Sequence, residues 1–115
     1  MPVTATKTIT VNTASATATS VTSDWVPFNI HQTPFNVGFG VVKTGGGDVT
    51  FRVEHTFDDV LDPSVTPVAF VHEDVSAASD SIDGNYAFGI RAARVAIVSA
   101  SGSVGVSFRP VQVGI

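Results

Sequence analysis

The side chains of this sequence that are able to bind a metal ion include three histidines, which lie far apart in the chain. His31, His55 and His72 form no short ligand-spaced pair, whereas a zinc site needs about three or four ligands that converge with tetrahedral geometry. His55 and His72 also fall on predicted strands, where a half-buried, hydrogen-bonded histidine is the simpler interpretation. We therefore expect no metal at the histidines.

Aspartates gather in two predicted loops. Asp58, Asp59 and Asp62 lie in one loop, and Asp80 and Asp83 lie in another. Calcium takes roughly six to eight oxygen ligands, so two acidic loops that met at one end of a domain would offer a site. No EF-hand spacing is present, and turn formation with hydrogen bonds from backbone N–H groups to Asp side chains explains these residues more simply.

Carboxylates that would support acid–base catalysis are scarce as well. Such chemistry needs two carboxylates that face each other across a cleft with separated pKa values, and the nearest group is Glu54 with Asp58 and Asp59. Glu54 is better explained by a structural ion pair, either with Arg52 on a neighbouring diagonal or with Arg94 across a sheet. Ser/His/Asp catalysis has no GxSxG turn to support it. We expect a protein that is not an enzyme and that holds no cofactor.

The elements that position these side chains are predicted to be short β-strands. Residues 49–57, VTFRVEHTF, alternate so that one strand face is mostly apolar and the other is polar. The mostly apolar face carries Val49, Phe51, Val53, His55 and Phe57. This segment is predicted to be a core strand of a two-layer β domain.

Two hairpins are predicted around glycine turns. Residues 35–43 and 49–57 would be joined by a turn at residues 44–48, whose three glycines lack the Lys-Ser/Thr of a phosphate-binding loop. Residues 93–99 and 104–113 would be joined at Ser101-Gly102. Between these hairpins we expect a strand at 66–72 that is buried on both sides, and a polar loop at 73–85 with room for one helical turn.

The N-terminal segment, residues 1–23, is rich in Thr, Ala and Ser and is interpreted as a strand or arm. Alternation predicts a strand over 7–12. Residues 13–20, TASATATS, carry no large apolar side chain. They fit a weak edge strand, an arm that orders against a neighbour, or a flexible tail.

Composition places the rest of the chain, residues 24–115, in a single all-β domain. Twenty valines and thirteen threonines stand against one leucine, and β-branched side chains favour strands. The predicted fold is an antiparallel β-sandwich, jelly-roll-like, with seven to eight strands. A net charge of −4 with 14% charged residues disfavours nucleic acid as a partner. No stretch has signal-peptide or transmembrane character, so we expect assembly in a cytoplasm, away from any membrane.

Three segments resemble a family of small structural proteins of tailed-bacteriophage virions. They are PFNVGFGVVKTGG, VTFRVEHTFDDVLDPSVTPVAFVH and GIRAARVAIVSASGSVGVSFRPVQVG, about two-thirds of the chain. The family's "V-E/Q-x-T-x-D-D" strand end falls on residues 53–59, and its Thr-Pro strand begins at Thr66. The "a-x-R-h-x-h" strand falls on 92–98, the Ser-Gly turn on 101–102, and the closing strand end on 112–114. The chain departs from the family at Gly89, where a proline is common, and at Arg109-Pro110.

The resemblance implies a capsid cement (decoration) protein of the virion surface, which binds and stabilises the major capsid protein shell and is assembled in the host cytoplasm. It also implies a homo-oligomer, a trimer or a dimer. Contacts to the capsid are expected from the N-terminal segment by strand addition to an exposed edge, and from the region around residues 25–35. The residues expected to bind partners are Trp25, Phe28, Phe35, Gly38 and Gly40.

A different function also fits a β-sandwich of this size. A carbohydrate- or receptor-binding domain of a phage tail or another surface structure would use exposed aromatic rings to stack on sugars. Trp25 and Tyr86 are the single Trp and the single Tyr, which makes this alternative weaker than the capsid protein.

Overall fold

The computed structural model describes residues 3–4, 7–31 and 34–112, with side chains from residue 21 onward. All regular elements of these residues are β-strands, and every strand pairing is antiparallel, so the predicted all-β class is confirmed. The strands are β1 (Val3–Thr4), β2 (Lys7–Thr22), β3 (Val26–Pro27), β4 (Val37–Thr44), β5 (Asp48–Thr56), β6 (Phe70–Val71), β7 (Ile82–Tyr86) and β8 (Ala92–Gln112). No helix suited to crossing a membrane is found in these residues.

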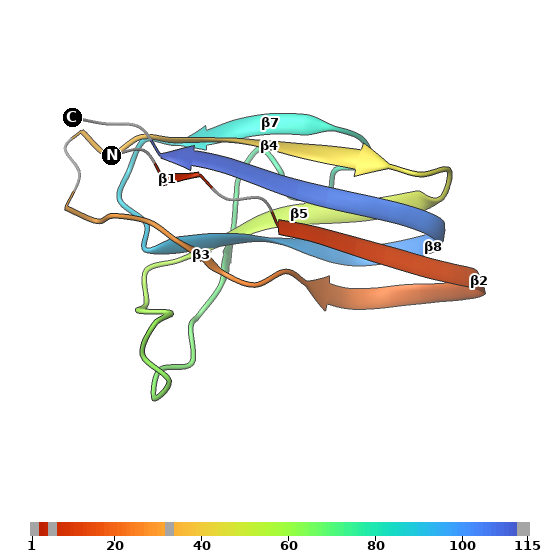
Figure 1. Ribbon diagram of the computed structural model, residues 1–115, viewed down its shortest axis with the longest axis horizontal. Coiled ribbons are helices and arrows are strands. Elements are labelled where there is room, and N and C mark those ends of the chain that lie inside the picture. The colour runs from red at the N-terminus through yellow and green to blue at the C-terminus, as the bar shows by residue number, and fades with distance from the viewer. Residues whose placement is uncertain (1–2, 5–6, 32–33, 113–115) are drawn as a thin grey trace.

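One sheet holds all of these strands, and β8 lies at its centre (Figure 1). The hydrogen-bonded order is β6-β5-β8-β4-β7, and β1, β2 and β3 pair with the other side of β8. The last described strand therefore pairs with nearly every other part of the sheet.

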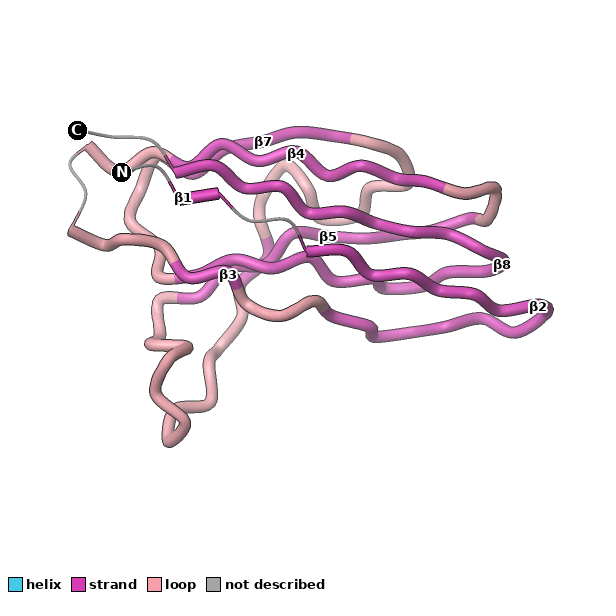
Figure 2. The backbone as a smooth tube through the Cα atoms, viewed as in Figure 1, coloured by secondary structure: helices cyan, strands magenta, loops and turns pink. Residues whose placement is uncertain are grey.

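A corner in the sheet explains how such long strands fit the molecule. At about 3.3 Å per residue a straight strand of this length would span roughly 70 Å, because β8 has 21 residues. The longest extent of the molecule is only 46 Å. Figure 2 shows that β2, β8 and the β4–β5 segment all reverse direction at the same end of the molecule.

Both predicted hairpins are wrong, because their glycine turns form this corner instead. β4 pairs with the second half of β8, and β5 pairs with the first half, so β4 and β5 follow β8 around the bend without pairing with each other. Gly45 and Gly102 have φ angles of 89° and 77°, in the region that glycine enters without steric cost. The backbone N–H of Gly47 donates to the carbonyl oxygen of Ser103 at 2.9 Å, which ties the two bends together.

The strands also do not form the predicted sandwich of two separate sheets. Because β2, β8 and β4–β5 continue through the corner, the described strands form one strongly curled open sheet, a half-barrel. The core lies inside the curl, with apolar side chains from both sides of the corner. It includes Val37, Phe39, Val41, Phe51, Val53, Val95, Ile97, Val106 and Phe108.

In two segments, residues 66–72 and 73–85, the structure differs from the sequence-based prediction. Only Phe70–Val71 of the predicted strand at 66–72 pairs as a strand, and both residues are exposed rather than buried on both sides. The predicted loop at 73–85 contains most of β7 and no helical turn. Both segments lie beyond β5 and β4 in the strand order, where the local pattern of a segment does not show how much of it is paired or buried.

The N-terminal segment runs along β8 as β2. Its pairing extends from Lys7↔Phe108 to Thr22↔Ala96, with an irregularity between Thr13 and Thr17 at the corner. Of the three interpretations of residues 13–20, the described backbone adopts the strand. Residues 1–2 and 5–6 of the predicted arm lie outside the described residues, as do residues 113 and 114 of the predicted closing strand.

Candidate functional site

Three phenylalanines with exposed rings gather where β5 and β7 end and β6 begins. Phe57, Phe70 and Phe88 are 48%, 49% and 54% exposed. The ring centroids of Phe57 and Phe70 are 5.6 Å apart, and those of Phe57 and Phe88 are 6.4 Å apart. We call these three residues the aromatic patch. Exposed aromatic rings in mutual contact are typical of surfaces that bind a partner.

A buried histidine and tyrosine form the base of the aromatic patch. His55 lies opposite Phe70 in the β5–β6 pairing, and its ring contacts all three phenylalanines of the patch, at 5.5 to 6.0 Å between centroids. Its Nδ1 shares a 2.9 Å hydrogen bond with the hydroxyl of Tyr86. Burial lowers the pKa of His55, and the nearby His72 lowers it further. Burial also raises the pKa of Tyr86, with a smaller contribution from the charge of Glu54, so its hydroxyl stays protonated.

A cavity of about 380 Å³ opens beside the aromatic patch, between β6 and the end of β7. We call it the β6–β7 cavity. Its wall combines aromatic rings with two carboxylate side chains. The lining residues are His55, Val71, His72, Glu73, Asp74, Asn85, Tyr86, Ala87 and Phe88.

His72 connects the two sides of this cavity. Its Nδ1 accepts a hydrogen bond from the backbone N–H of Asp74 at 3.1 Å, and its Nε2 lies 2.9 Å from the carbonyl oxygen of Asn85. Because a backbone carbonyl only accepts, Nε2 must carry the proton and donate it. β6 pairs with β5 and β7 pairs with β4, so this hydrogen bond joins the two halves of the curled sheet that meet at the corner.

Glu54 lies on the face of β5 that points away from the core, and both predicted ion pairs are confirmed. Arg52 Nε donates to Glu54 Oε2 and Arg94 Nε donates to Glu54 Oε1, each at 2.8 Å. The guanidinium carbon of Arg94 also lies 4.1 Å from the centre of the Trp25 ring. Because both carboxylate oxygens accept charged hydrogen bonds, the geometry of this group is that of a structural network.

The predicted hydrogen bonds from backbone N–H groups to Asp side chains are confirmed for four of the five aspartates, Asp58, Asp59, Asp62 and Asp80. Asp59 Oδ1 accepts the backbone N–H of Leu61, and Asp62 Oδ1 accepts that of Ser64. The hydroxyl and backbone N–H of Ser64 lower the pKa of Asp62. In the part of the chain that the structure describes, no group of three or more His, Cys, Asp or Glu side chains is placed to hold a metal ion.

The five residues predicted to bind partners do not come together at the aromatic patch. Phe28 is 8% exposed and belongs to the core, and Phe35 packs against the core from its margin. Trp25 is half-buried beside Arg94. The rings of all three are less exposed than those of the aromatic patch.

Gly38 and Gly40 lie on β4 and face away from the core. A Cβ atom built on either residue would meet no atom within 4 Å. Gly38 pairs with Asn85 of β7 and Val111 of β8. The two glycines therefore leave a flat strip, without side chains, on the outer side of β4.

Sequence reasoning missed the aromatic patch because it placed Phe57 and Phe70 with the core residues on their strand faces. Alternation identifies the face of a strand but does not show where along that face the core ends. A usable signal was present: Phe57 directly precedes Asp58-Asp59, and Phe88 lies between Ala87 and Gly89. A large ring beside turn-forming residues marks the end of a strand.

Comparison with known proteins gives no further guide to function. No protein-family model, curated protein or solved structure matches the chain. The function has to be inferred from the chain's own residues and surface.

Proposed function

We propose that this chain is a structural protein of a tailed-bacteriophage virion, of the capsid cement type, and that it acts by binding rather than by catalysis. Its partner would be the major capsid protein, and its place would be the outer surface of the capsid, after assembly in the host cytoplasm. The observation that carries the proposal is the exposed aromatic patch of Phe57, Phe70 and Phe88. Aromatic side chains are enriched among the residues that dominate protein–protein binding energy.

The position of the aromatic patch supports the proposal in a second way. Phe57 and Phe70 both lie in the segment VTFRVEHTFDDVLDPSVTPVAFVH, which resembles capsid cement proteins. A ligand that binds only the assembled shell stabilises it by mass action. Many copies on a symmetric lattice would add avidity to a modest single-site affinity.

The flat strip at Gly38 and Gly40 supports a role in association between copies of the chain. With no Cβ atoms, the strip lets another backbone approach the outer face of β4 closely. We include in the proposal a homo-oligomer, a trimer or a dimer, built on this strip.

Co-sedimentation with expanded capsids of the phage that encodes the chain tests the proposal. The wild-type protein should pellet with capsids at a defined stoichiometry. Phe88→Ser should weaken attachment by roughly tenfold or more, because it removes an exposed anchor without opening the core. Leu61→Ser is the matched control: Leu61 is 75% exposed but lies outside the patch. A wild-type protein that stays in the supernatant at micromolar concentration would refute the proposal.

A carbohydrate-binding function is the second candidate, and one observation favours it. The exposed ring of Phe88 lies beside Asn85 and Glu73 in the β6–β7 cavity, and a ring next to amide and carboxylate groups is suited to a sugar. Reproducible micromolar binding of the isolated protein to a glycan array, lost in Phe88→Ser, would favour this candidate over the capsid protein.

A further inference from the structure

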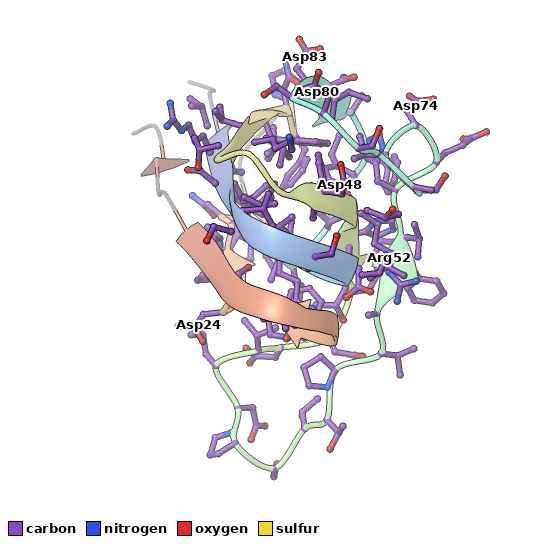
Figure 3. All side chains as sticks on the ribbon, turned by 90° about the vertical axis from the view of Figure 1, so that its right-hand side faces the viewer. Asp24, Asp48, Arg52, Asp74, Asp80 and Asp83 are labelled. Atoms are coloured by element: carbon purple, nitrogen blue, oxygen red, sulfur yellow. The ribbon has the colours of Figure 1, made fainter. Side chains whose placement is uncertain are left out.

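The β6–β7 cavity has a charge character that specifies the partner more closely than the aromatic patch does. Glu73 and Asp74 are exposed at its wall, and none of the described residues that line it is Lys or Arg. Figure 3 shows Asp74, Asp80 and Asp83 on the side of the molecule that carries β7, away from Asp24. The opening is therefore negatively charged.

Aromatic rings lie next to this negative opening. The Tyr86 and Phe88 rings meet edge to face at 5.6 Å, and both line the cavity. The face of an aromatic ring attracts a cation, and Arg and Lys are the side chains that use this attraction. A long basic side chain would also place its apolar stem against Val71 and Ala87, which line the same cavity.

The buried groups at the base of the cavity are compatible with a cation. The Nδ1 atom of His72 accepts a hydrogen bond from the backbone N–H of Asp74, so this atom presents no N–H group to a cation. Burial keeps the pKa of His55 below its ordinary value of 6.5, which disfavours a positive charge on this ring at neutral pH. Together with the carboxylates at the rim and the exposed ring of Phe88 on the wall, these groups form a site that favours positive charge.

We propose that the β6–β7 cavity receives a lysine or arginine side chain of the protein to which the aromatic patch binds. The head group would pair with Glu73 and Asp74 while its stem and charge lie against the exposed ring of Phe88. This inference rests on the proposed function, since it specifies the chemistry of the capsid surface at the same site.

The capsid assay separates the failure of this inference from the failure of the proposed function. The double variant Glu73→Gln/Asp74→Asn should weaken attachment of the protein to capsids by roughly tenfold and reduce its dependence on salt. The control Asp24→Asn/Asp48→Asn changes the net charge equally, and neither residue lines the cavity; it should bind like the wild type. If both double variants attach to capsids as strongly as the wild type does, the inference is overturned and the proposed capsid function stands.

A direct measurement on the isolated protein keeps the inference testable whatever the capsid assay gives. The probes are N-acetyl-lysine-methylamide, N-acetyl-leucine-methylamide and methyl glucoside, each titrated into isotope-labelled protein. The lysine probe should shift the NMR signals of Asn85, Tyr86 and Phe88 in the wild type, but not in Glu73→Gln/Asp74→Asn. Equal shifts with the leucine probe, larger shifts with the glucoside, or no shift with any probe would overturn it.

Discussion

Glu54 shows how a charged residue is tolerated in a position that is nearly closed to water. Its side chain is only 4% exposed, and both of its oxygens accept hydrogen bonds from arginine. A buried carboxylate with both oxygens paired avoids the penalty of an uncompensated charge, although such networks contribute more to a defined geometry than to net stability. Arg94 reaches from Glu54 to Trp25, and this network fixes the N-terminal entry to β3 against β5 and β8.

His55 makes the stability of the fold depend on pH. Its pKa is lowered in the folded state, so the unfolded chain binds more protons once the pH falls below about 6.5, and the free energy of unfolding decreases with acidification. The stabilisation is complete above pH 6.5 and is lost towards the lower folded-state pKa. Urea unfolding at pH 7.5 and 5.5 should show this loss, in a range where carboxylates of ordinary pKa remain ionised.

Two variants separate the titration of His55 from its other roles. His55→Gln should be less stable at pH 7.5 but should lose most of the pH dependence. Tyr86→Phe removes the hydroxyl bonded to His55 Nδ1 and should cost roughly 1–2 kcal/mol at both pH values, while the pH dependence persists because burial is its main cause. Identical pH dependence in His55→Gln and the wild type would contradict this account.

The corner is the element on which the sheet depends, and its glycines are not equivalent. A Cβ atom on Gly47 would clash with the carbonyl oxygens of Ser101 and Ser103, whereas a Cβ atom on Gly46 would meet nothing within 4 Å. Gly47→Ala should therefore destabilise the protein by roughly 2 kcal/mol or more, and Gly46→Ala by less than about 0.5 kcal/mol. Thermal and urea unfolding of the two variants measure the difference. Equal stability of the two variants would show that the corner opens without cost.

Local pattern predicted the strands but not their partners. Residues 49–57 and 35–43 were recognisable as strands because alternation and β-branching are local properties, and β5 and β4 confirm them. The glycine turn between them fits a hairpin and a corner equally well. β8, about 50 residues further along the chain, decides between the two. It pairs with both strands, so their backbone groups form hydrogen bonds with β8 and not with each other.

The candidate site was less predictable than the strands. The Glu54 ion pairs were predictable, because Arg52 lies two residues away on the same strand and Arg94 was expected across the sheet. The aromatic patch and the β6–β7 cavity did not, because they are built from three strand ends that only the curl of the sheet brings together. His72 illustrates the difficulty: its link to Asn85 joins the two strands that lie furthest apart in the sheet order.

At the scale of the whole molecule, β2 is part of the sheet rather than a separate arm. It pairs with β8 along both sides of the corner, so its removal would expose the N–H and C=O groups of a central strand. Deleting residues 1–20 should lower the stability of the domain and promote self-association, because an open strand edge is a template for pairing with another chain. Sedimentation velocity of the deletion variant and the full chain at equal concentration measures this. A variant with the assembly state and melting temperature of the full chain would show that β2 is dispensable.

The late position of β8 in the chain has a consequence for biosynthesis. β2, β4 and β5 leave the ribosome before the strand that pairs with all three, and Lys7 finds its partner only at Phe108. Pairings this distant make folding slow, and the sheet stays incomplete until residues 92–112 have been translated. The sheet can therefore form only after β8 has left the ribosome, and a premature stop codon anywhere before residue 92 would yield a product without the strand that unites the sheet.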